Sequence, residues 1–117
     1  MPIRVLYAPV YHDNIQLMIE FERVEGFDWD VGNALKSVSK HGVTPAEAEQ
    51  IFFNEPLIVV SDEQHSRAER RYHALGHTHE DRLLHITFTL RSHATKIRII
   101  SARDIHRKER AIYEKEA

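Results

Sequence analysis

Residues Arg82–Arg103 read RLLHITFTLRSHATKIRIISAR and hold two runs of alternating apolar and polar side chains around a short polar segment. Because side chains of a β-strand point alternately to opposite faces, the first run places Leu84, Ile86, Phe88 and Leu90 on one face. Its other face carries a mostly polar row, namely Leu83, His85, Thr87, Thr89 and Arg91. The segment Ser92-His93-Ala94 leaves room only for a short turn, so we predict an antiparallel hairpin with one core face and one basic face.

The second run of this hairpin is expected to alternate in the same way. Regular alternation predicts that Ile97, Ile99 and Ser101 share one face. The opposite face of the run would then carry Lys96, Arg98, Ile100 and Ala102. On this interpretation Arg91 and Arg98 lie on the basic face of the hairpin, where we look for function.

Two helices are predicted before the hairpin. Asp30 is placed as the N-cap of a helix through about Lys40, because its carboxylate can accept hydrogen bonds from the first backbone amides. The spacing of Val31, Leu35 and Val38 predicts its buried stripe. Gly42 is suited to the left-handed conformation that ends many helices.

The second predicted helix begins at a capping box. Thr44-Pro45-Ala46-Glu47 combines an N-cap threonine, a proline at the first helical position and a glutamate three residues after the cap. Ala48, Ile51 and Phe52 are expected to face inward, and the helix is expected to stop before Pro56. The short connection to the first helix predicts a helical hairpin.

The rest of the chain supplies strands and one more helix. Strands are predicted over residues 21–29, 57–61 and 71–77, and Asp104 is predicted to cap a final, highly charged helix through about Glu114. Ile105, Glu109 and Ile112 have the spacing of a narrow stripe on that helix, which is apolar at its two isoleucines. This order predicts an α+β fold in which a helical hairpin packs on one face of an antiparallel sheet, followed by a C-terminal helix. Residues 1–20 are either an added edge strand or an extension, so we divide the chain into 1–20 and a domain of 21–117.

Composition limits the classes of function. With 117 residues and 42% hydrophobic residues, one globular domain is expected, and no cysteine is present for disulfides or thiolate metal sites. No apolar run approaches the roughly 20 residues that span a bilayer, which predicts no membrane contact and a cytoplasmic location. The net charge of −2 argues against binding nucleic acid by bulk charge alone. Lysine and arginine nevertheless concentrate after Arg67, and nine histidines are present.

The basic face suits cleavage of RNA. Arginine recognises phosphate through two parallel hydrogen bonds, and histidine exchanges a proton near neutral pH. Cleavage at a 2′-hydroxyl needs a base, an acid and cations, without a metal ion. The alternative is a solvated strand face without a ligand. A zinc site in the turn His77-x-His79-Glu80-Asp81 has the wrong spacing for a known ligand set, so we predict no metal and no cofactor. Trp29 is either a core anchor or a base-stacking platform.

Short motifs in a specific order resemble a known family. They are Phe27-Asp28-Trp29-Asp30, Asn33, Lys40-His41-Gly42-Val43, Glu47-Ala48, Phe52, Glu55-Pro56-Leu57, His65-Ser66, Glu69-Arg70-Arg71, Gly76, Arg82-Leu83-Leu84, Arg91, residues 97–103 (IRIISAR), Glu109-Arg110 and Tyr113-Glu114. Together they are similar to the BrnT toxins of bacterial type II toxin–antitoxin pairs, over about Phe27 to Glu114. The chain departs from the usual pattern in its longer N-terminus and in Asp28, where glutamate is more common.

This resemblance implies a RelE-like fold and a metal-independent ribonuclease that inhibits translation. It also implies neutralisation by a BrnA-type antitoxin, a ribbon-helix-helix protein that alone contacts operator DNA, in an assembly built on dimers. The family's basic positions correspond here to the predicted catalytic residues Lys40, His41, Arg71 and Arg91. Further RNA contacts are predicted for Arg98, Arg103 and His85. His41 is our candidate for proton transfer, although on local grounds Lys40 and His41 are cations at a helix end. The alternative is a catalytically inactive, toxin-like binding module that sequesters an antitoxin or acts in operator regulation.

Overall fold

The computed structural model describes residues 9–12, 15–18, 23–62, 64 and 68–116. Its strands are β1 (Pro9–His12), β2 (Ile15–Met18), β3 (Gly26–Phe27), β4 (Ile58–Asp62), β5 (Arg71–His77), β6 (Leu83–Arg91) and β7 (Lys96–Asp104). Its helices are α1 (Val31–His41), α2 (Pro45–Gln50), the short 3-10 helix η2 (Ile51–Phe53) and α3 (Arg107–Glu116). The strands form one sheet in the order β2-β1-β4-β5-β6-β7-β3.

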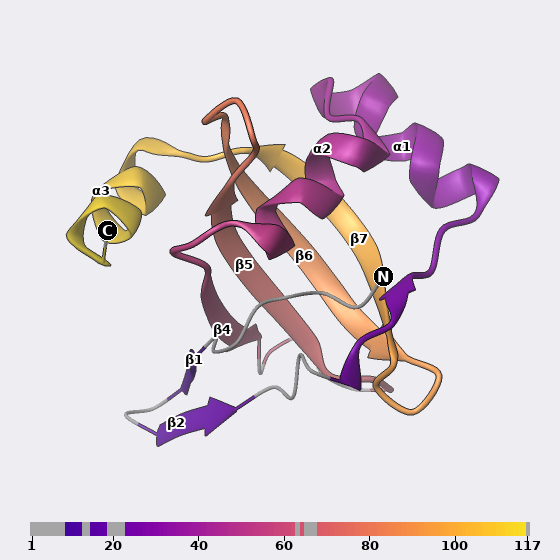
Figure 1. Cartoon of the computed structure of the whole chain (residues 1–117), viewed down its shortest axis with the longest axis horizontal. Helices are drawn as coiled ribbons and strands as arrows, with labels where there is room; N and C mark the ends of the chain where they lie inside the picture. The colour runs from indigo at the N-terminus through magenta and orange to yellow at the C-terminus, as the bar shows by residue number, and fades with distance from the viewer. Residues whose placement is uncertain (1–8, 13–14, 19–22, 63, 65–67, 117) are drawn as a thin grey trace.

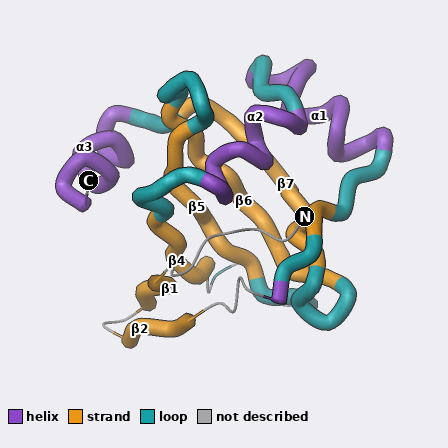
Figure 2. The backbone as a smooth tube through the Cα atoms, viewed as in Figure 1, coloured by secondary structure: helices purple, strands orange, loops and turns teal. Residues whose placement is uncertain are grey.

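The sheet is antiparallel at its centre and mixed at its edges (Figures 1 and 2). Strands β4 to β7 pair antiparallel in sequence order, whereas β1 pairs parallel with β4 and β3 pairs parallel with β7. The predicted α+β class, with a C-terminal helix after the last strand, is confirmed. β1 and β2 form an antiparallel pair joined to β4, so part of residues 1–20 extends the sheet, and the proposed division at residue 20 stays a prediction.

One face of the sheet carries the core under the helical hairpin. Phe52 of η2 meets Phe88 of β6 edge to face, with ring centroids 5.2 Å apart, and meets Phe27 of β3 at 5.7 Å. The buried apolar residues of this layer are Val24, Val43, Ala48, Ile51, Phe52, Leu57, Val59, Ala74, Leu84, Ile86, Phe88, Ile97, Ile99 and Ala102. Their removal from water is the main force that holds α2 and η2 on the sheet.

Local signals at the helix ends are confirmed. Thr44 and Glu47 form the reciprocal capping box, with the Thr44 hydroxyl accepting from the Glu47 amide at 3.1 Å. Asp30 and Asn33 cap α1 in the same reciprocal manner, at 2.9 and 2.7 Å. Gly42 has φ of +66°, the left-handed conformation expected at the end of α1.

Three predictions about the elements are corrected. The strand predicted over 21–29 is reduced to Gly26–Phe27, with Phe21 outside the described residues. The second helix turns into the 3-10 helix after Gln50. Val31, predicted to be buried, is 76% exposed, because it stands in the first turn of α1 beyond the edge of the core. The side chains of Leu35 and Val38, the other two residues of that stripe, lie outside the description.

The C-terminal helix also differs from its prediction. Asp104 is the last residue of β7, where its carboxylate accepts from Arg82, and α3 begins only at Arg107. Ile112 is 54% exposed, whereas Tyr113 is buried and donates its hydroxyl hydrogen to the Pro56 carbonyl at 2.7 Å. The aromatic side chain at the next position therefore anchors the helix in place of Ile112.

Candidate functional site

The face of the sheet opposite α1 and α2 is polar and partly open. Because alternate residues share a face, this face receives side chains from β5, β6 and β7. Its members are Arg71, His73, Leu75, His77, His85, Thr87, Thr89, Arg91, Lys96, Arg98, Ser101 and Arg103. We call this surface the open face; α3 covers only one part of it (Figure 1).

A β-bulge in β7 decides which of its residues reach the open face. Phe88 pairs with Ile99 and Thr87 pairs with Ser101, so Ile100 has no partner position on β6. The extra residue reverses the alternation beyond it. The predicted positions of Ser101 and Ala102 are therefore wrong: Ala102 is fully buried in the core and Ser101 is on the open face. As a result Arg103 lies directly opposite His85.

At one end of the open face lies the arginine cluster, which we define as Arg71, Arg91 and Arg98. Arg71 begins β5, Arg91 ends β6 and Arg98 is near the start of β7, so three neighbouring antiparallel strands bring them together. Arg91 donates two hydrogen bonds to the Glu69 carboxylate, at 2.9 and 3.3 Å. That contact lowers the pKa of Glu69, and the charges of the two other arginines add to the effect.

Arg98 connects the arginine cluster to the start of α1. Its Nη2 lies 2.7 Å from Oδ2 of Asp30, and its Nη1 lies 3.7 Å from Oδ1 of Asp28. The same Asp30 carboxylate accepts from the Asn33 amide, and this bond and the Arg98 bond lower the pKa of Asp30. Arg98 thus contacts the segment at the start of α1 with both terminal nitrogens of its guanidinium.

Farther along the open face lies the histidine cluster, which we define as His73, His85, Arg103 and Glu109. His73 Nδ1 lies 3.0 Å from His85 Nε2, and His73 Nε2 lies 2.8 Å from Oδ2 of Asp62. Since a carboxylate only accepts hydrogen bonds, we assign the proton of His73 to Nε2. Nδ1 of a neutral His73 is then an acceptor for the His85 ring or for the Thr87 hydroxyl, which is 2.9 Å away.

Glu109 of α3 contacts two other members of this cluster, Arg103 and His85. Its carboxylate accepts from both terminal nitrogens of Arg103, at 2.9 Å each, and from the His106 amide at 2.8 Å. His85 Nδ1 lies 3.1 Å from Glu109 Oε2 and also contacts Arg103 Nη2. Burial alone would raise the pKa of Glu109, but the bonds from Arg103 and His106 outweigh it and lower the pKa to about 2.

His85 is held in its neutral form by its surroundings. Burial is the main cause that lowers its pKa to about 4, and the neighbouring Arg103 charge lowers it further, against the opposing effect of Glu109. The histidine rings pack edge to face with centroids 4.9 Å apart. Beside them is a pocket of about 220 Å³ lined by Ile58, Val60, His73, Leu75, His85, Glu109 and Ile112.

Lys40 and His41 lie at a different end of the molecule from the arginine cluster. His41 is close enough to Asp104 that its charge helps lower the pKa of that carboxyl, after the larger effect of the hydrogen bond from Arg82. Asp104 ends β7 and Lys96 begins it, so roughly 25 Å of strand separates the two ends. The structure therefore does not bring Lys40 and His41 together with Arg71 and Arg91.

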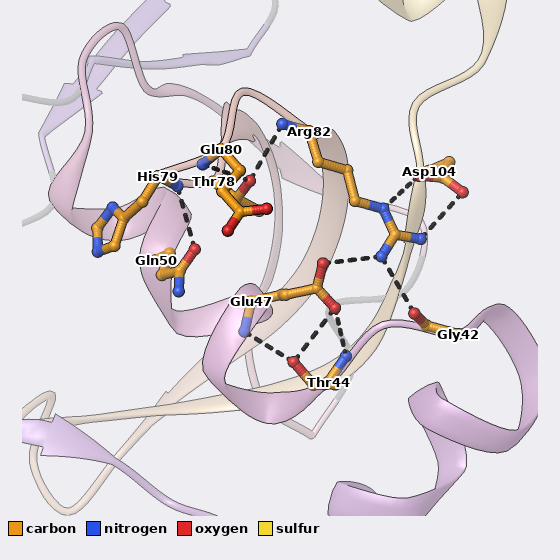
Figure 3. A network of polar contacts seen from close by, with 9 residues as sticks. All are labelled: Gly42, Thr44, Glu47, Gln50, Thr78, His79, Glu80, Arg82 and Asp104. Atoms are coloured by element: carbon orange, nitrogen blue, oxygen red, sulfur yellow. Dashed lines mark hydrogen bonds and ion pairs between the residues drawn. The ribbon is translucent and has the colours of Figure 1, made fainter.

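Arg82 fixes the loop that follows His41. Its guanidinium donates to Asp104 at 2.8 and 3.1 Å, to Glu47 at 2.9 Å and to the Gly42 carbonyl at 3.1 Å (Figure 3). One side chain thus joins the end of α1, the start of α2 and the end of β7. Figure 3 also shows the Thr44–Glu47 capping box beside it.

The remaining candidates from the sequence have structural partners. His77 Nδ1 lies 2.8 Å from the Tyr113 hydroxyl, and His79 Nδ1 lies 3.1 Å from the Asn54 amide nitrogen. Among the residues described, no three His, Cys, Asp or Glu side chains are grouped as metal ligands would be. Trp29 packs against the core and donates to Glu49 at 2.6 Å. Within the same residues, every helix is too short or too polar to cross a bilayer.

Sequence reasoning missed the roles of Asp62 and Glu109. Asp62 ends β4 and was assigned to a loop, and Glu109 was assigned to a helix stripe. The cross-strand register would have found Asp62, which is opposite Arg71 and diagonal to His73. The position of Glu109 depends on how α3 crosses the sheet, which no local pattern encodes.

Comparison with known proteins identifies the family. The family model described as "Ribonuclease toxin, BrnT, of type II toxin-antitoxin system" matches residues 29–109, more than half of the chain. The matched segment runs from Trp29 to Glu109 and includes both clusters on the open face. The comparison with curated proteins gave no match. The chain therefore belongs to the BrnT family, the ribonuclease toxins of type II toxin–antitoxin systems, with RNA as its target and an antitoxin as its partner.

Proposed function

We propose that this protein cleaves RNA on the open face without a metal ion and thereby inhibits translation in the cytoplasm. The observation that carries the proposal is the arginine cluster, in which three neighbouring strands each contribute one guanidinium to one end of an accessible surface. Planar guanidinium groups suit phosphate oxygens. Because Arg91 and Arg98 are ion-paired with Glu69 and Asp30 in the free protein, the support for the proposal is this grouping of guanidinium groups and not a net local positive charge.

The reaction requires only groups that protein side chains supply. The 2′-oxygen of a ribose attacks the adjacent phosphorus, and the bond from phosphorus to the 5′-oxygen of the next nucleotide breaks. A base takes the 2′-hydroxyl proton and an acid gives a proton to the departing 5′-oxygen, leaving a 2′,3′-cyclic phosphate. In this proposal Arg71 and Arg91 bind the scissile phosphate and stabilise the charge that develops on its oxygens.

The other predicted positions have separate places in the proposal. Arg98, Arg103 and His85 bind the RNA along the same face. His41, predicted for proton transfer with Lys40 in support, lies beside the opposite end of β7, too far to exchange a proton at a phosphate held by Arg71 and Arg91. Their contribution is therefore tested independently of the arginine cluster.

The partner is proposed to be a BrnA-type antitoxin. In this proposal the antitoxin is a ribbon-helix-helix protein that alone contacts operator DNA, and the toxin joins it in an assembly built on dimers. The negative net charge of the toxin is consistent with DNA contact through the partner.

The test is an RNA cleavage assay with purified toxin, freed from its antitoxin, in the presence of EDTA. Arg71→Gln and Arg91→Gln should each lower the cleavage rate by about 10²- to 10³-fold, the usual cost of losing one charge-stabilising group. Lys108→Gln, at an exposed position of α3, is the charge-matched control and should keep the rate. His41→Ala should keep the rate if Arg71 and Arg91 hold the scissile phosphate, whereas a loss of about 10²- to 10⁴-fold would place the proton transfer, and with it the reaction, at the opposite end of β7. Intact RNA after incubation with folded wild-type protein would refute the proposal.

One observation favours a second candidate, an inactive module that only binds the antitoxin. Arg91 and Arg98 already have carboxylate partners, Glu69 and Asp30, at the positions where a phosphate would bind. Expression without the antitoxin separates the two candidates. Growth arrest supports the ribonuclease, whereas normal growth together with tight binding of the antitoxin supports the module.

A further inference from the structure

α3 is attached to the open face at two main points. Tyr113 is buried and its hydroxyl contacts both the Pro56 carbonyl, at 2.7 Å, and His77 Nδ1, at 2.8 Å. Near the start of the helix, Glu109 contacts Arg103 and His85. Most other residues of α3 are exposed, including Ile112 at 54%. The helix thus covers the histidine cluster with little buried apolar surface to hold it there.

The contacts of Glu109 are those of a bound anion. Two guanidinium nitrogens of Arg103, one backbone amide of His106 and one ring nitrogen of His85 surround its two oxygens within 3.1 Å. Arginine binds a phosphate with the same paired geometry that it uses for a carboxylate. The three N–H donors, two from Arg103 and one from His106, therefore fit either anion, with His85 Nδ1 beside them.

The location of this anion site matches the proposed path of RNA. Arg98 of the arginine cluster and Arg103 both project from β7 onto the open face, roughly 15 Å apart along the strand. The bulge at Ile100 is what places Arg103 on this face. One RNA strand lying along β7 would thus meet both guanidinium groups.

We infer that Glu109 occupies a second phosphate-binding site of the toxin, and that a phosphodiester of bound RNA replaces the Glu109 carboxylate on Arg103 and His85. This inference rests on the proposed function and assigns its substrate contacts. Binding of RNA then requires α3 to give up its contact through Glu109. The helix lowers RNA affinity in the free protein, and any change that weakens Glu109 or its helix raises it.

The experiment measures binding of a fluorescein-labelled, 2′-O-methyl RNA oligonucleotide, which lacks the attacking hydroxyl and stays intact. Glu109→Gln removes the charge of the competing group, and Glu114→Gln removes the same charge from an exposed site on the same helix. Glu109→Gln should bind about fivefold more tightly than Glu114→Gln, the gain expected from one freed ionic contact. Its plot of log affinity against log salt should also steepen by about 0.7, the value for one more phosphate neutralised on a single strand.

Two further variants make the result specific. The Arg103→Gln/Glu109→Gln double variant should lose the gain, because the freed guanidinium is absent. Tyr113→Phe removes the two hydroxyl contacts of α3 without a charge change and should raise the affinity for RNA about twofold. This variant replaces Glu109→Gln as the test if Glu109→Gln fails to fold. Equal binding by Glu109→Gln and Glu114→Gln, or a gain that persists without Arg103, would overturn the inference. Wild-type protein that neither binds nor cleaves RNA would instead refute the proposed function itself.

Discussion

Ile86 and Ala102 lie directly opposite each other on β6 and β7, and both side chains are fully buried. Simple alternation along β7 would put Ser101 in this position. We therefore expect Ala102→Asn to lower the free energy of unfolding by about 2–4 kcal/mol, because it buries a larger, unpaired polar group. Ser101→Asn, on the open face, should change it by less than about 1 kcal/mol. Urea unfolding at pH 7.5 measures both, and the reverse order would show that the bulge is misplaced.

Gly76 of β5 is required by the close approach of η2. A methyl group on Gly76 would lie 2.9 Å from Cβ of Ile51 and 3.3 Å from Cδ1 of Leu57. Because Ile51 is fully buried and cannot retreat, Gly76→Ala should cost about 1–3 kcal/mol of stability. Gly26→Ala is the control, because among the described residues its new methyl group would come within 4 Å of Lys96 Nζ alone, at an ordinary 3.7 Å. Thermal unfolding compares the two, and equal melting temperatures would contradict the packing described.

Arg82 should contribute more stability than an ordinary surface arginine. Arg82→Ala removes hydrogen bonds to two carboxylates and one carbonyl, but the site is partly exposed, so the expected cost is about 1–2 kcal/mol. Arg110→Ala removes an exposed pair with Glu114 at 3.7 Å and should cost less than about 0.5 kcal/mol. Urea unfolding of both variants at 0.1 M and 1 M NaCl gives the comparison. A similar loss from both would mean that Arg82 does not brace the helical hairpin.

Stability should fall as pH is lowered through the range in which His85 titrates. In the unfolded chain His85 takes up a proton near pH 6.5, but burial and Arg103 lower its pKa in the folded protein to about 4. Between these values the unfolded state binds more protons, so acidification from pH 7 to pH 4.5 favours unfolding, by about 2–3 kcal/mol for this residue. His85→Gln should flatten this part of the pH profile of unfolding free energy.

The matched control for this prediction is His93→Asn. His93 is exposed in the β6–β7 turn and has φ of +57°, a conformation that asparagine tolerates. Its replacement should leave the slope of the profile unchanged. A slope that survives in His85→Gln would assign the pH dependence to other groups.

Local features were predictable from the sequence because they depend on residues a few positions apart. The Thr44–Glu47 capping box, the left-handed Gly42 and the first strand of the hairpin formed as expected. The bulge was not predictable from alternation, because the partner positions on β6 determine that Ile100 is the extra residue. Arg103 and His85 were both predicted as RNA contacts. Their position directly opposite each other depends on the bulge, so it could not be predicted from alternation.

The location of a candidate site residue was predictable where it depends only on which end of a strand the residue occupies. Arg71, Arg91 and Arg98 were expected on one face, and the alternating strand directions gather them at one end of the sheet. Lys40 and His41 were expected near them, but the connection of the helical hairpin places His41 beside Asp104 instead. The contact of Glu109 with Arg103 depends on the path of the chain after β7.

The attachment of α1 to β7 has a consequence for how the toxin is made. The side-chain amide of Asn33 donates to the Ile99 carbonyl at 3.1 Å across 66 residues of sequence, and β3 pairs with the start of β7. During synthesis the helical hairpin leaves the ribosome long before its docking strand exists, and such distant contacts form slowly. Arg98 and Arg103 reach the surface on that same late strand. A nascent chain therefore lacks the complete RNA-binding surface proposed here until β7 has left the ribosome.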